Sequence, residues 1–169
     1  QAIQAGHAAF QRGAFAEARR HLQRIDHPKA IHLLGLVEKS DGNLPKAMEL
    51  LQRAAALDSQ DPEIANNLAL VAQSSGRLDL AESEFRRAIK IRPDFFQAVS
   101  GLGRLLIDLE RWPEALSVYE GMSKSAPANV VVRYGLATAF LGLGQAEQAE
   151  SLFDALIGEG HDRPEVRFM

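Results

Sequence analysis

Three features are missing from this sequence of 169 residues: cysteine, a long apolar run and an excess of positive charge. Without cysteine there is no disulfide framework, thiolate metal site or cysteine nucleophile. No apolar run reaches the roughly 18 residues that a helix needs to span a bilayer, so we expect no membrane insertion. The formal net charge is −3, which gives no positive field to attract phosphates, and we expect no nucleic-acid partner. We expect the cytoplasm as the compartment, with the periplasm as the alternative.

Motifs for catalysis or metal binding are missing as well. The histidines show no metal-ligand spacing such as H-E-x-x-H, and no serine or aspartate partner can be argued for them. They are His7, His21, His27, His32 and His161. The triplet "GLG" at 101–103 and 142–144 lacks the preceding strand of a dinucleotide-binding loop, so we interpret its glycines as close-packing and turn residues. We therefore predict no catalytic residue, metal, cofactor or enzymatic activity for this chain.

What the sequence does contain is a repeat. An alanine recurs at intervals of 34 residues, except for a first interval of 29, as Ala18, Ala47, Ala81, Ala115 and Ala149. Four residues after each alanine comes a large apolar side chain: Leu22, Leu51, Phe85, Tyr119 and Phe153. Twelve residues before each alanine comes a small residue: Gly6, Gly35, Ala69, Gly103 and Ala137. These spacings predict two packed helices joined by a tight turn, repeated along the chain.

The pattern within each unit is helical. In "IANNLALVAQSSG" the apolar residues fall at i, i+4, i+7 and i+8 from Ile64, which places them on one helical face. Three of these first helices end at a glycine that can supply the positive φ common at helix C-termini: Gly42, Gly76 and Gly144. Pro45 and Pro113 suit the first turn of a second helix. Sustained two-residue alternation is lacking, so we predict an all-α chain.

At these positions the chain resembles the tetratricopeptide repeat family. It meets the 34-residue helix-turn-helix pattern of that family in "LLG...G...A...L..A" from 33 to 54 and again in each later unit. The third unit matches at Leu68, Ala69, Gly76, Ala81, Phe85, Ala88 and Pro93. Trp112 departs from the pattern because it lies at a turn, and Glu110 replaces the turn glycine of the fourth unit. The first unit has lost five residues around "RIDHPKA", so we expect its second helix to be about a turn short.

The resemblance implies a right-handed superhelical α-solenoid of about five helix-turn-helix repeats, forming a single array over residues 1–169. We place the units at about 1–27, 28–61, 62–95, 96–129 and 130–163, with 164–169 as the start of a further helix. The last full helix carries more apolar bulk than one neighbouring helix needs. We therefore predict that the native protein continues into another helix, and that this chain self-associates through its C-terminal repeat.

The resemblance also implies a function. In such arrays the first helices of successive units line a concave surface, which suits an extended or helical peptide of a partner protein. Carried over by position, the groove residues are His32, Lys39, Asn66, Asn67, Gln73, Arg104, Tyr134 and Thr138. We expect an interaction scaffold. The alternative is the N-terminal recruiting region of a larger enzyme, because the sequence resembles repeats that precede sulfotransferase or O-linked N-acetylglucosamine transferase-like domains in bacterial proteins.

Overall fold

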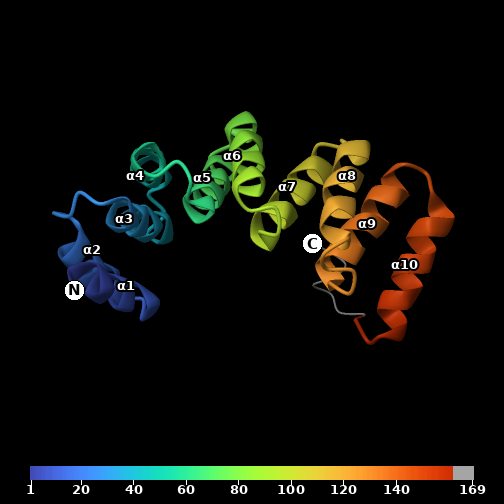
Figure 1. Ribbon diagram of the computed structural model, residues 1–169, viewed down its shortest axis with the longest axis horizontal. Helices are drawn as coiled ribbons and strands as arrows, with labels where there is room; N and C mark the ends of the chain where they lie inside the picture. Colours follow the sequence, from blue (N-terminus) through green and yellow to red (C-terminus); the bar gives the residue numbers. More distant parts are fainter. Residues whose placement is uncertain (162–169) are drawn as a thin grey trace. The chain divides into compact units, whose positions relative to one another are not determined.

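The computed structural model describes residues 1–161, which form ten helices and no strand (Figure 1). In order they are α1 (Ala2–Gln11), α2 (Phe15–Leu22), α3 (Pro28–Ser40), α4 (Leu44–Leu57), α5 (Pro62–Ser74), α6 (Leu78–Ile91), α7 (Phe96–Asp108), α8 (Trp112–Ser123), α9 (Val130–Gly142) and α10 (Ala146–Gly158). The prediction of an all-α fold is confirmed. The further helix that the sequence predicts from Pro164 lies outside the described residues.

The helices pack as successive pairs within two compact units. The first unit is Gln1–Ile91, with α1 to α6, and the second begins at Arg92, with α7 to α10. In the first unit the first helices of the pairs, α1, α3 and α5, contact one another in sequence, and α7 contacts α9 in the second. Helices α3, α5, α7 and α9 begin 34 residues apart. A single array running through both units stays a prediction.

Side-chain caps fix the start of some of the helices, including α5 and α9. The Oδ1 atom of Asp61 accepts hydrogen bonds from the backbone N–H groups of Glu63 and Ile64 at 2.8 and 3.3 Å. Pro62 occupies the first turn of α5, where its missing N–H leaves no intrahelical bond unmade. Asn129 caps α9 in the same way as Asp61 caps α5. These caps set where α5 and α9 begin, and so they set the position of the side chains that these two helices carry.

Helix ends follow the glycine prediction. Gly42, Gly76 and Gly144 have φ angles of 79°, 73° and 73°, which are left-handed and favour glycine. Glu110, which replaces the glycine of the fourth turn, has φ 56° and is the only non-glycine residue with positive φ among residues 1–161. The fourth turn therefore keeps the left-handed backbone conformation although it lacks glycine, and this conformation has a steric cost for Glu110.

The small and bulky positions of the repeat pack against each other. A Cβ atom on Gly35 would lie 2.8 Å from Cγ of Leu51, and one on Gly103 would overlap the ring of Tyr119. Real Cβ atoms do not approach so closely, so glycine allows each first helix to lie against its second helix. Gly142 packs against Trp112 in the same manner, while Gly144 ends α9. Within the two "GLG" triplets, the interpretation is confirmed for Gly103 and Gly142 as packing residues and for Gly144 as a turn residue.

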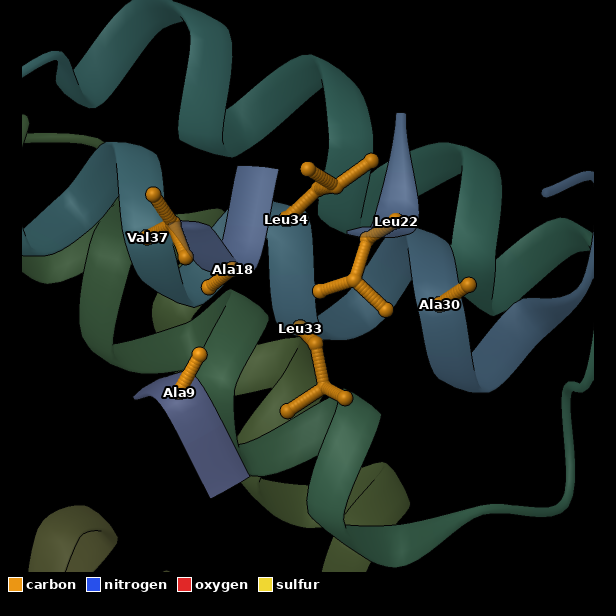
Figure 2. Close-up of a cluster of buried hydrophobic side chains, with 7 residues drawn as sticks. All are labelled: Ala9, Ala18, Leu22, Ala30, Leu33, Leu34 and Val37. Carbon is orange, nitrogen blue, oxygen red and sulfur yellow. The ribbon is translucent and has the colours of Figure 1, made fainter. Parts of the chain in front are cut away.

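The core of the N-terminal repeats is made of aliphatic side chains and alanines. Figure 2 shows one cluster where α1, α2 and α3 meet, made of Ala9, Ala18, Leu22, Ala30, Leu33, Leu34 and Val37.

Helix α2 is shorter than the other second helices of this unit. It ends at the buried Leu22 after 8 residues, whereas α4 and α6 have 14 each. The predicted shortening of this helix is confirmed, and it exceeds one turn.

Candidate functional site

The first helices of the N-terminal unit enclose a cavity of about 420 Å³, hereafter the groove cavity. Its apolar lining comes from α1 and α3 and consists of Ile3, Phe10, Leu33 and Leu36. Its polar lining consists of Gln4 and His7 on α1, Lys29 and His32 on α3, Glu63 and Asn67 on α5, and the α5 cap Asp61. An apolar floor with a few convergent polar groups is the usual character of a ligand site.

A hydrogen bond joins two helices across this cavity. The side-chain amide of Asn67 on α5 lies 2.8 Å from Nε2 of His32 on α3. Because the amide N–H donates, Nε2 accepts, and the proton of the neutral ring is on Nδ1. Burial lowers the pKa of His32, and the nearby carboxylates of Asp61 and Glu63 oppose this in part. His32, only 8% exposed, is therefore a neutral acceptor that orients Asn67.

The orientation of Asn67 decides what it offers to a ligand. With one amide N–H bound to His32, the amide keeps an oxygen acceptor and a second N–H donor. The oxygen can accept a hydrogen bond from a peptide N–H of a ligand, and the remaining N–H can donate one to a peptide C=O. The apolar floor formed by Phe10, Leu33 and Leu36 lies in the same cavity. The arrangement can hold a backbone amide at Asn67 and an apolar side chain on the floor.

The structure brings together only part of the predicted groove set. His32 and Asn67 line the groove cavity, whereas Lys39, Asn66 and Gln73 do not. Lys39 and Gln73 are half-buried near the ends of α3 and α5. Asn66 is only 6% exposed, and its side-chain oxygen has no hydrogen-bond partner within residues 1–161. The N-terminal site therefore centres on the His32–Asn67 pair.

The remaining predicted residues belong to the C-terminal unit. Arg104 is exposed on α7. The ring of Tyr134 on α9 meets that of Phe153 on α10 edge-on, with centroids 5.7 Å apart. The hydroxyl of Thr138 donates to the backbone oxygen of Tyr134 at 2.9 Å. Tyr134 and Thr138 thus make contacts inside their own helix pair, and Arg104 is the freely accessible member of the three.

Sequence reasoning missed the contribution of α1, although a signal for it was present. His32 and Leu36 stand three residues before and one residue after Gly35, the small packing residue of their unit. The same offsets from Gly6 give Ile3 and His7, and both line the groove cavity. The offsets agree in α1 and α3 because Gly6 and Gly35 occupy equivalent packing positions in the two helices. They do not extend to α5, where the offsets from Ala69 give Asn66 and Leu70, and neither lines the groove cavity.

Within residues 1–161, no helix is both long and apolar enough to cross a bilayer. In the same part, three or more histidine, aspartate or glutamate side chains do not gather closely enough to hold a metal ion.

Comparison with known proteins gives the class of this molecule. Models of the tetratricopeptide repeat family match residues 32–94, 66–130 and 106–167, which together are most of the sequence. The chain belongs to the tetratricopeptide repeat family. A crystal structure of MamA has the same fold, with a TM-score of 0.82 and 21% identity over 94% of this chain and 90% of that one. The resemblance seen in the sequence is confirmed.

Curated relatives are similar over part of their length. Small glutamine-rich tetratricopeptide repeat-containing protein 2 of Mycosarcoma maydis is 32% identical over 93 residues, 55% of this chain and 26% of the relative. The peroxisomal targeting signal receptor of Eremothecium gossypii is 31% identical over 109 residues, 64% of this chain and 19% of the relative. This chain therefore spans about a quarter or less of the length of these relatives.

Proposed function

We propose that this chain is a protein-interaction module that binds a peptide segment of a partner protein in the groove cavity of its N-terminal unit. The observation that carries the proposal is the His32–Asn67 hydrogen bond, which sets an amide over an apolar floor. The His32–Asn67 pair and the floor supply groups suited to recognition of a peptide: an amide, a neutral ring, and aliphatic and aromatic surface.

The partner's backbone and side chain have separate binding places. Asn67 takes a peptide group of the ligand, and an apolar side chain of the ligand packs on Phe10, Leu33 and Leu36. The charged lining includes Asp61 and Glu63 at the start of α5 and Lys29 in the first turn of α3. An extended peptide crossing from α1 to α5 would meet these charges in turn, which favours a ligand whose own charges are mixed.

The second candidate, a recruiting region of a larger enzyme, is not favoured. A relative named as a targeting signal receptor matches 64% of this chain, and reception of a signal is a binding activity. The other predicted groove residues, namely Lys39, Asn66, Gln73, Arg104, Tyr134 and Thr138, are retained as proposed contributors to further contacts. The cytoplasmic location, the lack of a nucleic-acid partner and self-association through the C-terminal repeat stay predictions.

The proposal is tested by selecting displayed random peptides on the full chain and measuring the selected peptides by calorimetry. We expect Asn67→Ala to weaken binding by about 1 to 3 kcal/mol, because a buried peptide group loses its partner. Gln52→Ala, an exposed change on α4, is the matched control and leaves binding unchanged.

Circular dichroism of each variant checks that helicity is kept. Selection of no peptide, or selected peptides whose affinity is the same for the Asn67 variant and the unmodified chain, would overturn the groove cavity as the binding site.

A further inference from the structure

The N-terminal unit has a second cavity of about 420 Å³ on its other side, among the second helices α2 and α4 and the segment that joins α2 to α3. We call it the notch. It adjoins the end of α2, which stops at Leu22 after 8 residues, six fewer than α4. A second helix of full length would continue past Leu22, so the notch lies where the shortened repeat lacks helix. No residue of the notch lines the groove cavity.

The floor of the notch is aliphatic. Ile25, from the joining segment, faces the cavity together with Ile31 and Leu34 of α3 and Leu50 of α4. Ile31 and Leu34 are nearly buried by the core, with 2% and 9% exposure, whereas Ile25 and Leu50 are half-buried. The notch therefore offers aliphatic surface on an enclosed floor, and its volume is within the range of small ligand sites.

The rim of the notch is charged. Its charged lining consists of Arg19, Arg24, Lys46, Arg53, Asp26 and Glu38, which is four cations against two carboxylates. Asp41 and Glu49, which lie just outside the lining, pair with Arg19 and Lys46, so positive and negative charges around the notch balance. An acidic ligand would therefore be recognised by individual cations that are unpaired or weakly paired, and not by a net positive field.

The rim cations differ in how firmly they are held. Arg19 is fixed by Glu38 at 3.0 Å and by Asp41 at 2.6 Å, and these two hydrogen bonds raise its pKa. Arg53 pairs with Asp26 at 2.7 Å, but the two side chains are 57% and 73% exposed. An ion pair so open to water contributes little, so an incoming carboxylate can replace Asp26.

Two more cations are available to a ligand. Arg24 makes no hydrogen bond or ion pair with any residue from 1 to 161. Lys46 pairs with Glu49 at 2.8 Å, and that pair is also largely exposed. Arg24, Lys46 and Arg53 can therefore bind a ligand at the edge of the floor, whereas Arg19 is held by its own ion pairs.

We propose that the notch is a second binding site, which takes an acidic peptide segment of a partner protein. One apolar side chain of the peptide enters over Ile25 and Leu50, and carboxylates on both sides of it meet Arg24 and Arg53. This site is separate from the groove cavity, and it does not depend on the function proposed for that cavity. A nucleic acid would bring phosphates but no aliphatic side chain for the floor, so the combination of floor and rim favours the peptide.

The test uses the full chain and a panel of fluorescein-labelled synthetic peptides, each with one Leu, Ile, Met or Phe flanked on both sides by pairs of Asp or Glu. Binding is measured by fluorescence anisotropy at physiological salt. We expect Arg24→Glu with Arg53→Glu to weaken binding by about tenfold or more. The matched control is Arg77→Glu with Lys90→Glu, which changes the net charge equally at exposed positions outside the notch, and it should change affinity by less than about threefold.

A second variant tests the floor without changing charge. Ile25→Trp fills the notch and should also abolish binding, with helicity checked by circular dichroism. Asn67→Ala should leave the acidic peptides bound, which separates failure here from failure at the groove cavity. An equal loss in both charge-reversal variants, equal binding of peptides with Ser in place of the apolar residue, tighter binding of a single-stranded oligonucleotide, or no peptide bound in the panel would overturn the proposal.

Discussion

In the second and fourth repeats, different residues make the contact between the two helices and the turn that joins them. In α3–α4, Gly35 lies against Leu51, and the turn between the helices contains Gly42. In α7–α8, Gly103 lies against Tyr119, and the turn contains Glu110 with φ 56°. In both pairs the second helix begins 16 residues after the first, at 44 after 28 and at 112 after 96. The comparison teaches that the contact between small and bulky residues maintains the repeat, while the turn residue affects its stability without changing its path.

The largest expected effect is at the packing contact of the fourth repeat. Gly103→Ala should lower the free energy of unfolding by about 2 kcal/mol, because a Cβ atom there overlaps the rigid Tyr119 ring, which is also packed closely against Gly135. Urea titration followed by circular dichroism measures this. Gly121→Ala in α8 is the matched control. It has open space around the new Cβ and should instead stabilise by about 0.5 kcal/mol.

The equivalent change in the second repeat sharpens the comparison. Gly35→Ala should cost less than Gly103→Ala, because the atom it meets is the Cγ of a flexible Leu51 and not an aromatic ring. Equal losses at the two sites, or a gain at Gly103, would show that the repeat is not maintained by this contact.

A smaller effect is expected from exchanging the two turn residues. Glu110→Gly should stabilise the protein by about 0.5 to 1 kcal/mol, because glycine adopts positive φ without steric cost. Gly42→Glu should destabilise it by about 1 kcal/mol, since φ is 79° there and no atom lies near the new Cβ to add a clash. Thermal melts of the two variants measure both changes. If both changes had the same sign, the backbone angle would not be the cause.

The smallest expected effect concerns how the stability of the protein depends on pH. The second repeat has the titratable His32 where the fourth repeat has Ser100. Burial lowers the pKa of His32 from 6.5. Below pH 6.5 the unfolded chain therefore binds a proton that the folded chain does not. Stability is complete above pH 6.5 and declines as pH falls from there to the lower folded-state pKa.

The measurement is a series of thermal melts across this pH range. His32→Gln should flatten the decline, while Gln52→Ala, an exposed change on α4 that removes no titrating group, should leave it as it is. An unchanged decline in the His32 variant would contradict the assignment of a buried neutral ring.

Much of the fold could be predicted from sequence because its determinants are local. Gly42, Gly76 and Gly144 mark turns through backbone freedom, and Gly35 marks a close approach at a fixed distance from Leu51. These signals depend on spacing along a helix, which the sequence displays directly.

The sites were less accessible to sequence reasoning. His32 and Asn67 were placed on the groove by position, but their hydrogen bond depends on side-chain rotamers that spacing does not determine. The notch depends on the path of the segment between Leu22 and Pro28, which has no periodic pattern to interpret.

The contact between Trp112 and Gly142 makes intrinsic fluorescence a probe of one part of the molecule. Trp112 is the only tryptophan of the sequence, and it lies where α8 meets α9, so its emission reports on the junction of the fourth and fifth repeats. The N-terminal unit, which holds both cavities, contributes no tryptophan signal. A difference between unfolding curves followed by fluorescence and by circular dichroism would therefore reveal how cooperatively the two units melt, without any label added.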